Sequence, residues 1–236
     1  GQWVRRWEDI PPSRLLMFDT SAAQFLELAG SRLPWWYRKQ LQAFRGSPGV
    51  FKIDYALSDP VPWTHPEVAR AGTVHLGGTL DELSVAEGQV WRNEIPTNPY
   101  VLVSQPTLFD SSRAPTGKHV LWAYCHVPRG STHDMTAIIE AQIERFAPGF
   151  RDTILKRSVM TPADYQAYNP NFFGGDITGG ALLLQQLFTR PAVRVNPYST
   201  PLRGVYLCSS STPPGGGVHG QCGHHAALSA YRAHYL

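Results

Sequence analysis

Apolar residues recur along the chain at two spacings, and these spacings predict two kinds of element. Between residues 135 and 150 they follow one another at steps of four, four, three and four, which is typical of one buried helix face: Met135, Ile139, Ile143, Phe146 and Phe150. Residues 118–127 form the strongest strand-type run, and residues 50–57 alternate well enough for a second strand. The pattern therefore predicts a mixture of helices and strands.

Shorter patterns predict the remaining elements. Further strands are expected at residues 14–18, 73–76, 100–104, 157–160 and 205–208. Capping residues and prolines at first turns predict a helix that ends near residue 29, and others at residues 34–44, 66–71, 79–91, 134–146, 151–155 and 163–168 and from residue 221 on. Residues 182–188 fit either a helix or an irregular segment. We interpret this order as an α+β fold, with a mixed or antiparallel sheet and helices packed on one face.

The last segment, residues 204–236, predicts a strand, a glycine-rich loop and a helix. The loop contains Gly215, Gly217 and Gly220 in the order G-x-G-x-x-G. Glycines let a backbone approach a ligand closely, and a helix N-terminus presents unpaired N–H groups to it. Because no Asp or Glu follows the loop, it is not expected to start a dinucleotide-binding domain. It either holds an anionic or electron-rich group or is a structural turn. A close-packing helix face is expected at Ala226, Ala227, Ala230 and Ala233.

Composition narrows the class of protein. The 236 residues carry a formal net charge of +3, with 42% apolar and 17% charged residues. This is ordinary for a globular protein and too weakly basic to indicate nucleic acid or an anionic membrane. No stretch of about 18 apolar residues occurs, so no spanning helix is expected. Three cysteines form no disulfide framework, which predicts a reducing compartment, cytoplasmic or at the periphery of a membrane.

Other kinds of site were weighed on the residues alone. One histidine and cysteine cluster matches no zinc signature, so no metal site is expected at His219, Cys222, His224 and His225. Ser209–Ser211 follow a strand without the turn glycine of a nucleophile elbow, which argues against a hydrolase. The aromatic residues Trp35–Tyr37 either line an apolar pocket or belong to the core or an interface.

Three regions resemble one family of flavoenzymes: residues 48–57, residues 171–180 with 186–191, and residues 204–227. The last region carries Tyr206-Leu207-Cys208 and then Pro214-Gly215-Gly216-Gly217-Val218 in the order of a C-terminal flavin-contacting motif, although Ser209 stands where many members carry glycine. The chain thus resembles the phytoene desaturase-like (phytoene dehydrogenase-related) FAD-dependent oxidoreductases. Members of that family are longer and open with a Rossmann unit, whereas no G-x-G-x-x-G lies in the first 200 residues here.

The resemblance implies a C-terminal, substrate-domain part of an FAD-dependent oxidoreductase or desaturase that acts on an apolar substrate. Residues 1–195 would form the substrate-binding domain, with residues 50–57 in the sheet above the substrate cavity. Residues 196–236 would be a strand-loop-helix segment of the FAD-binding domain, with the N-terminal Rossmann unit absent. That missing half would be a partner, and exposed apolar surface would favour self-association. The fragment alone would bind no FAD and be inactive. The alternative is a stand-alone, non-catalytic module that binds an apolar ligand or a protein.

The resemblance also implies which residues meet the cofactor. The expected flavin contacts are Ser209, Ser210, Gly215, Gly216, Gly217, Val218, His219, Gly220 and Gln221. Gly174, Gly175 and Asp176 would lie where the substrate cavity meets the flavin, although Asp176 equally fits a turn-stabilising role. No catalytic side chain is assigned, because the flavin does the redox work and such a transfer needs no obligatory acid or base.

Overall fold

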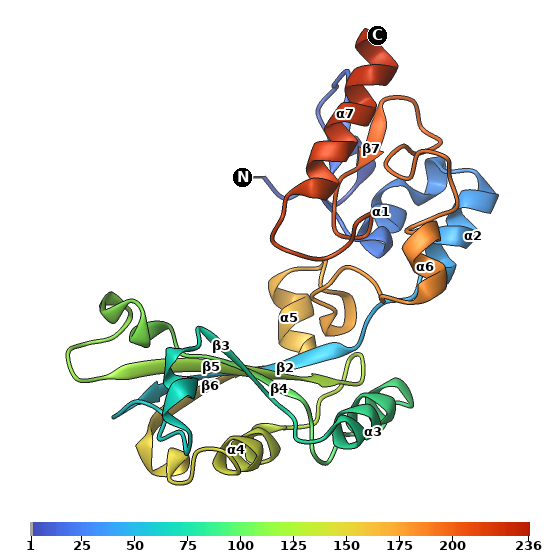
Figure 1. The fold of residues 1–236 in the computed structure, drawn as a ribbon. Helices are drawn as coiled ribbons and strands as arrows, with labels where there is room; N and C mark the ends of the chain where they lie inside the picture. Colours follow the sequence, from blue (N-terminus) through green and yellow to red (C-terminus); the bar gives the residue numbers. More distant parts are fainter. Residues whose placement is uncertain (1) are drawn as a thin grey trace. The chain divides into compact units, whose positions relative to one another are not determined.

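The computed structural model describes residues 2–236. The chain forms two compact units (Figure 1). Residues 48–168 form one of them, here called the central unit. The residues up to Ser47 and those from Asn169 to Leu236 form the other, here called the split unit. The boundaries thus fall after Ser47 and after Tyr168, whereas the sequence predicts one boundary between residues 195 and 196. The roles assigned to the two expected domains stay predictions.

A five-stranded antiparallel sheet forms the middle of the central unit. Its strands, in the order β3-β4-β5-β2-β6, are β2 (Gly49–Leu57), β3 (Thr73–Leu76), β4 (Val101–Ser104), β5 (His119–Val127) and β6 (Ile154–Met160). β2 and β5 pair along their whole length, from Gly49 opposite Val127 to Leu57 opposite His119. The expectation of an α+β fold with an antiparallel sheet is confirmed for this unit.

Helices lie on both sides of this sheet. They are α3 (Leu80–Trp91), α4 (Thr136–Glu144) and α5 (Pro162–Tyr168), with short 3₁₀ helices at Pro66–Arg70, Pro106–Leu108, Ser111–Arg113 and Phe150–Thr153. α4 lies on one side and α5 on the other (Figure 1), so the prediction of helices on one face is wrong for α5. The helix predicted at residues 151–155 is wrong at its end, because Ile154 pairs with Leu57 and so belongs to β6.

The core of the central unit lies between the sheet and α4. Alternate residues of β5 are buried: Leu121, Ala123, Cys125 and Val127. This alternation follows from the geometry of a strand, whose successive side chains point to opposite faces. Met135, Ile139, Ile143 and Phe150 are fully buried in the same cluster, and Phe146 packs against it half-buried. The helical stripe read from the sequence is therefore confirmed as core.

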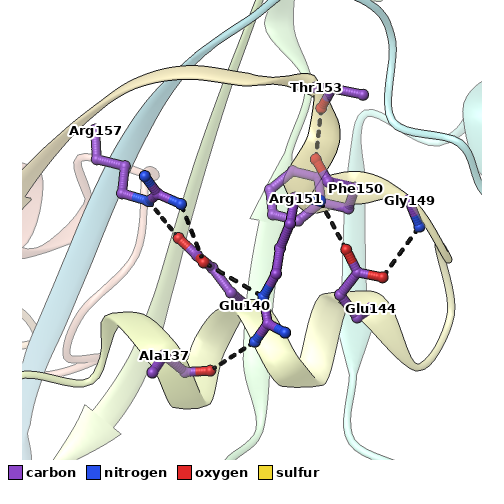
Figure 2. A network of polar contacts seen from close by, with 8 residues as sticks. All are labelled: Ala137, Glu140, Glu144, Gly149, Phe150, Arg151, Thr153 and Arg157. Carbon is purple, nitrogen blue, oxygen red and sulfur yellow. Dashed lines mark hydrogen bonds and ion pairs between the residues drawn. The ribbon is translucent and has the colours of Figure 1, made fainter.

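Polar side chains join α4 to the turn and strand that follow it (Figure 2). The carboxylate of Glu140 accepts hydrogen bonds from Nε and Nη2 of Arg157 on β6 and pairs with Arg151 at 3.5 Å. Glu144 accepts from the backbone N–H groups of Gly149 at 3.0 Å and of Arg151 at 2.7 Å. Glu140 is only 5% exposed, so its charge is buried, whereas the two arginines that neutralise it, Arg157 and Arg151, are partly open to solvent.

The split unit is built on a short parallel pair of strands from distant parts of the chain. β1 (Leu16–Phe18) pairs with β7 (Val205–Leu207), and Leu16 lies opposite Val205. Around them lie α1 (Ala22–Ala29), α2 (Trp35–Ala43), α6 (Leu184–Thr189) and α7 (Gln221–Tyr235), with 3₁₀ helices at Trp7–Asp9, Gly30–Arg32 and Phe173–Gly175. This long-range pairing places the first segment in the same unit as the C-terminal one, which local sequence patterns do not reveal.

Aromatic and aliphatic side chains fill the core of the split unit, among them Phe18, Phe25, Tyr37 and Leu207. The three neighbouring aromatic residues at the start of α2 differ in their exposure to solvent. Tyr37 is fully buried, whereas Trp35 is 64% and Trp36 is 39% exposed. One of the three is thus core, and the two tryptophans lie at the surface.

One face of α7 packs on the split unit. Its buried residues are Cys222, Ala226 and Ala230, at steps of four, whereas Ala227 and Ala233 are exposed. The predicted alanine face is therefore wrong for these two residues, because the buried stripe starts at Cys222. Within residues 2–236, none of the helices combines the length and the apolar character needed to cross a lipid bilayer.

Candidate functional site

Two glycine-rich segments of the split unit, residues 174–180 and 209–220, pack against each other. The hydroxyl of Ser211 donates to the carbonyl of Gly179 at 3.0 Å. A Cβ added at Gly216 would lie only 2.9 Å from the carbonyl oxygen of Thr178, so the absence of a side chain allows this close approach. The segments that carry the expected cofactor and substrate-region residues are therefore neighbours.

Asp176 organises the first of these segments. Its carboxylate is 5% exposed and accepts hydrogen bonds from the backbone N–H groups of Ser47 at 2.9 Å, Thr178 at 2.8 Å and Gly179 at 3.1 Å. Gly174 and Gly175 precede it with positive φ angles of 66° and 82°. Because its oxygens are engaged by backbone groups, the structure favours the turn-stabilising role for Asp176.

Ser209 and Ser210 lie in a tight turn after β7. Ser209 is 6% exposed, its hydroxyl accepts from the N–H of Ser211 at 3.2 Å, and its carbonyl accepts from the hydroxyl of Thr212 at 2.7 Å. The hydroxyl of Ser211 also accepts from the N–H of Ala22 at 3.2 Å, at the start of α1. These hydroxyl groups fix the turn and join it to α1.

The other expected flavin contacts lead into α7. Gly215 is buried, and an exposed glycine tip follows, formed by residues 216–220. Gly220 precedes α7 with a φ of 64° and has no side chain that could cap the helix. The ring Nδ1 of His219 accepts from the N–H of Gln221 at 3.0 Å. Because the first turn of a helix has N–H groups without intrahelical partners, the glycine tip is suited to an anionic or electron-rich group.

Arg190 lies buried beneath this loop. It is 1% exposed, and Nη2 donates to the carbonyl oxygens of Ser210 at 2.8 Å and Gly179 at 3.3 Å. Its guanidinium group lies over the ring of Phe44, 5.6 Å from the centroid. Its Nε–H and Nη1–H have no hydrogen-bond partner within residues 2–236. Burial lowers the pKa of this group, while Cys222 and Asp176 act to raise it. One side chain therefore contacts both glycine-rich segments.

Sequence reasoning assigned no role to Arg190, although it lies in a segment that carries the family resemblance. The available signal was its charge. Between residues 177 and 236 the sequence contains no Asp or Glu. An arginine that is buried in this segment therefore has no acidic partner close to it in the sequence. Its burial, however, is visible only in the fold.

Cys222 packs beneath the same loop. It is 6% exposed, and its Sγ lies 3.4 Å from the carbonyl oxygen of Gly215 and 3.6 Å from that of Thr212, to which it can donate. His224 and His225 are exposed on α7. Within residues 2–236, His, Cys, Asp and Glu side chains form no group of three or more that could hold a metal ion.

A second candidate surface lies on the central unit, on the face of β5 opposite the buried core. Trp122, Tyr124 and His126 are half-buried there, and the ring of Tyr100 lies 5.9 Å from that of His126. Burial raises the pKa of Tyr100 to about 12 and also raises the pKa of Tyr124, so both phenols are neutral at physiological pH. The ring Nδ1 of His126 lies 2.9 Å from the carboxylate of Glu87. These rings form a surface suited to an apolar molecule.

No family model matches the chain. In sequence it is 28% identical over 255 residues to the pyridine nucleotide-disulfide oxidoreductase domain-containing protein 2 of Rattus norvegicus, and the match covers 98% of this chain and 44% of the relative. It is 33% identical over 132 residues to the 4,4'-diapolycopen-4-al dehydrogenase of Metabacillus indicus, which covers 53% of this chain and 26% of that relative. The chain therefore spans less than half the length of these curated relatives.

The fold is similar to solved structures of oxidoreductases. An oxidoreductase from Methanosarcina mazei matches with a TM-score of 0.56 and 17% identity over 95% of this chain and 44% of that one. A variant of putrescine oxidase, from a redesign of cofactor binding, matches with a TM-score of 0.51 and 14% identity over 92% of this chain and 41% of that one. At such identities the likeness concerns the fold alone.

Proposed function

We propose that this chain is part of an FAD-dependent oxidoreductase that acts on an apolar substrate, with residues 209–221 at its flavin site. The observation that carries the proposal is the exposed glycine tip before α7, which is packed on a second glycine-rich segment and lies above a buried cation. Similarity to oxidoreductases along almost the whole chain supports it. A non-catalytic binding module is not favoured, because the relatives and structural neighbours are oxidoreductases.

The residues of the tip fit a flavin. Gly216, Gly217 and Gly220 expose backbone without side chains, and the ring of His219 accepts one N–H of the first turn of α7, that of Gln221. A flavin nucleotide carries an anionic diphosphate and an electron-rich ring, which match backbone N–H donors at the positive end of a helix dipole. FAD, when bound, supplies the redox chemistry. The chain's own residues would bind and orient it, and their N–H groups would stabilise negative charge that develops on the ring.

The central unit supports the choice of an apolar substrate. Its half-buried aromatic surface, formed by Tyr100, Trp122, Tyr124 and His126, offers rings and neutral phenols. Such a surface binds apolar molecules by burial and ring contacts, and its hydroxyl groups can orient one polar end. The proposal assigns substrate contact to these rings and gives none of them a catalytic role.

The split unit supports a further partner. Parallel sheets are normally larger and covered on both faces, yet β1 pairs only with β7 within residues 2–236. Large apolar side chains are also exposed on the same unit, with Leu184 at 75%, Phe188 at 83% and Trp35 at 64%. We therefore propose that a dinucleotide-binding half is the partner that extends this sheet. The part of the relatives that this chain does not cover is long enough to supply it.

A visible absorption spectrum tests the proposed function. The protein would be purified from its complete natural reading frame, and the 236-residue chain would be purified separately and supplied with FAD. Flavin bands in the first preparation that persist through gel filtration are the expected result. Absence of flavin bands from both would contradict the proposal and favour a binding module. Sedimentation of the 236-residue chain tests the partner: concentration-dependent association is expected, and a concentration-independent monomer would argue against exposed docking surface.

A further inference from the structure

Arg190 carries a positive charge inside the split unit without a counter-ion. Its side chain is 1% exposed, and it takes part in none of the ion pairs found within residues 2–236. Arginine keeps its proton in proteins, and an unpaired charge that is removed from water is strongly destabilising. Something must therefore compensate for the burial of this guanidinium group.

Neighbouring protein groups compensate for only part of it. Nη2 donates to two neutral carbonyl oxygens, of Ser210 and Gly179, and the ring of Phe44 covers one side. Nε–H and Nη1–H are buried and have no partner within the described residues. Buried donors are normally satisfied in native proteins, so two open donors on one buried cation indicate a missing acceptor.

The carboxylate that acts on Arg190 through space is already engaged elsewhere. Asp176 acts on Arg190 through space, but its oxygens accept backbone N–H groups of Ser47, Thr178 and Gly179. The sequence from residue 177 to the last residue provides no other carboxylate side chain. No carboxylate side chain of this segment therefore neutralises Arg190.

Nη1 of Arg190, one of the two donors without a partner within residues 2–236, lies next to the glycine loop. A Cβ added at Gly215 would lie 3.5 Å from both Cζ and Nη1 of Arg190. The guanidinium group therefore packs directly against the loop backbone at Gly215. The carbonyl of Gly215 in turn lies 3.4 Å from Sγ of Cys222, in the first turn of α7. The cation and the positive end of the helix dipole therefore act at the same loop, and both favour an anion there.

We propose that Arg190 is the anion-binding residue of this loop, and that its open N–H groups receive a negatively charged or electron-rich group of a ligand. The inference deepens the proposed function, on which the identity of the ligand rests: in a flavin enzyme the group is the diphosphate or the electron-rich edge of the ring. A small movement of the loop at Gly215, which carries no side chain, gives the ligand access.

Thermal unfolding with and without added anions tests this proposal. The probes are inorganic pyrophosphate and FAD, each compared with sodium chloride at the same ionic strength. The wild-type protein is compared with R190M, which removes the charge, and with R194M as a matched control. Arg194 is half-buried in the same unit, but its Nη2 already has a partner in the hydroxyl of Ser199 at 3.2 Å.

The expected result is that pyrophosphate or FAD raises the unfolding temperature of wild type and R194M and that R190M loses this response. The dissociation constant is expected to weaken roughly tenfold or more in R190M, because hydrogen bonds to charged groups are the strong ones. A response to both probes assigns Arg190 to the diphosphate, and a response to FAD alone assigns it to the ring. Equal shifts in wild type and R190M, or no shift with either probe, would overturn the proposal.

A measurement on the wild-type protein decides the matter if R190M does not fold. The Nε–H of a buried arginine gives its own signal in a nitrogen-edited NMR spectrum, and R190K identifies this signal by its loss. Addition of pyrophosphate or FAD is expected to shift it, and an unchanged signal at saturating concentrations would refute the proposal. The visible spectrum separates the two ideas. If pyrophosphate gives an Arg190-dependent response but no flavin bands appear, the anion site is supported and the proposed flavin function is refuted. If flavin bands appear but Arg190 does not respond, the flavin function is supported and the role of Arg190 is refuted.

Discussion

Glu140 in the central unit and Arg190 in the split unit are both buried charges, but their surroundings differ. Glu140 is 5% exposed and is neutralised by Arg157 and Arg151, as Figure 2 shows. Arg190 is 1% exposed, and its neighbours are two carbonyl oxygens and a phenyl ring. A buried charge with a complete set of partners holds the fold, whereas one with open donors is suited to receive something.

The sheets of the two units also differ in how completely their strands are paired. In the central unit β2 and β5 pair over nine residues each and have further strands on both sides. In the split unit β1 and β7 pair over three residues, and within residues 2–236 no strand pairs with the other edge of β1. The long strands β2 and β5 are thus paired along both edges, whereas β1 has one open edge, and for that reason we place the proposed strand partner in the split unit.

Glu140→Gln is the substitution with the largest expected effect. It leaves the guanidinium groups of Arg157 and Arg151 without their shared carboxylate, and the loss in free energy of unfolding is expected to be roughly 2–4 kcal/mol. The estimate is reduced from that of a fully buried pair because the side chain of Arg157 is 42% exposed. Urea unfolding of the variant and of wild type measures the difference.

Two further variants turn this experiment into a test of the comparison. Glu67→Gln breaks an exposed pair with Arg70 and is expected to change stability by less than about 1 kcal/mol. Arg190→Met, without added anion, is expected to destabilise far less than Glu140→Gln, because it removes an uncompensated charge. If Arg190→Met were as destabilising as Glu140→Gln, the contrast between the two buried charges would be lost.

The central unit could be predicted largely from sequence, and the reason is that its signals are local. The steps of four, four, three and four from Met135 to Phe150 identified the buried stripe of α4 and of the turn after it, and Thr79 with Glu82 formed the predicted capping box of α3. The split unit could not be predicted in this way. The pairing of β1 with β7 joins residues almost the whole chain apart, and no periodicity near Leu16 indicates its partner.

The flavin and substrate roles of the candidate site stay predictions. The glycine loop was visible as a motif, and Ser211 and Gly216 approach Gly179 and Thr178 of the second segment named from the resemblance. Arg190 was missed because burial of a charged side chain opposes the ordinary tendency of arginine to lie at the surface. Asp176 was left open between two roles, and only the direction of its hydrogen bonds separated them.

Ala226→Leu tests whether α7 packs on the split unit as described. Ala226 is fully buried, so a larger side chain is expected to overpack the interface and lower the free energy of unfolding by about 1–3 kcal/mol. Ala227→Leu, at the exposed neighbouring position, is the matched control and is expected to have little effect. Equal effects of the two variants in thermal unfolding would show that α7 does not present this face to the core.

Each unit has a helix whose first turn is capped by a side-chain hydroxyl group, so the stability of the two units can be compared with matched variants. Ser21 caps α1 in the split unit and Thr79 caps α3 in the central unit, and each hydroxyl accepts a backbone N–H at 3.2 Å. Each alanine variant is expected to lose about 1 kcal/mol. Hydrogen exchange of α1 and α3 then reports where the loss is felt: faster exchange confined to the capped helix is expected, and unchanged exchange in both would contradict the cap assignments.

Glu82→Gln has the smallest expected effect and tests the central unit by pH. The N–H of Thr79, at 2.8 Å, and Arg145 lower the pKa of Glu82 from its ordinary value of 4.5. Since the folded state holds the charged form, this contribution is fully present above the ordinary pKa and is lost as pH falls through the lowered one. Wild type should therefore be more stable than the variant near neutral pH, and the difference should vanish in acid. Asp81→Asn removes a neighbouring charge but leaves the Thr79 contact intact. If it reproduced the same pH dependence, general charge at the start of α3, rather than the capping hydrogen bond, would be the cause.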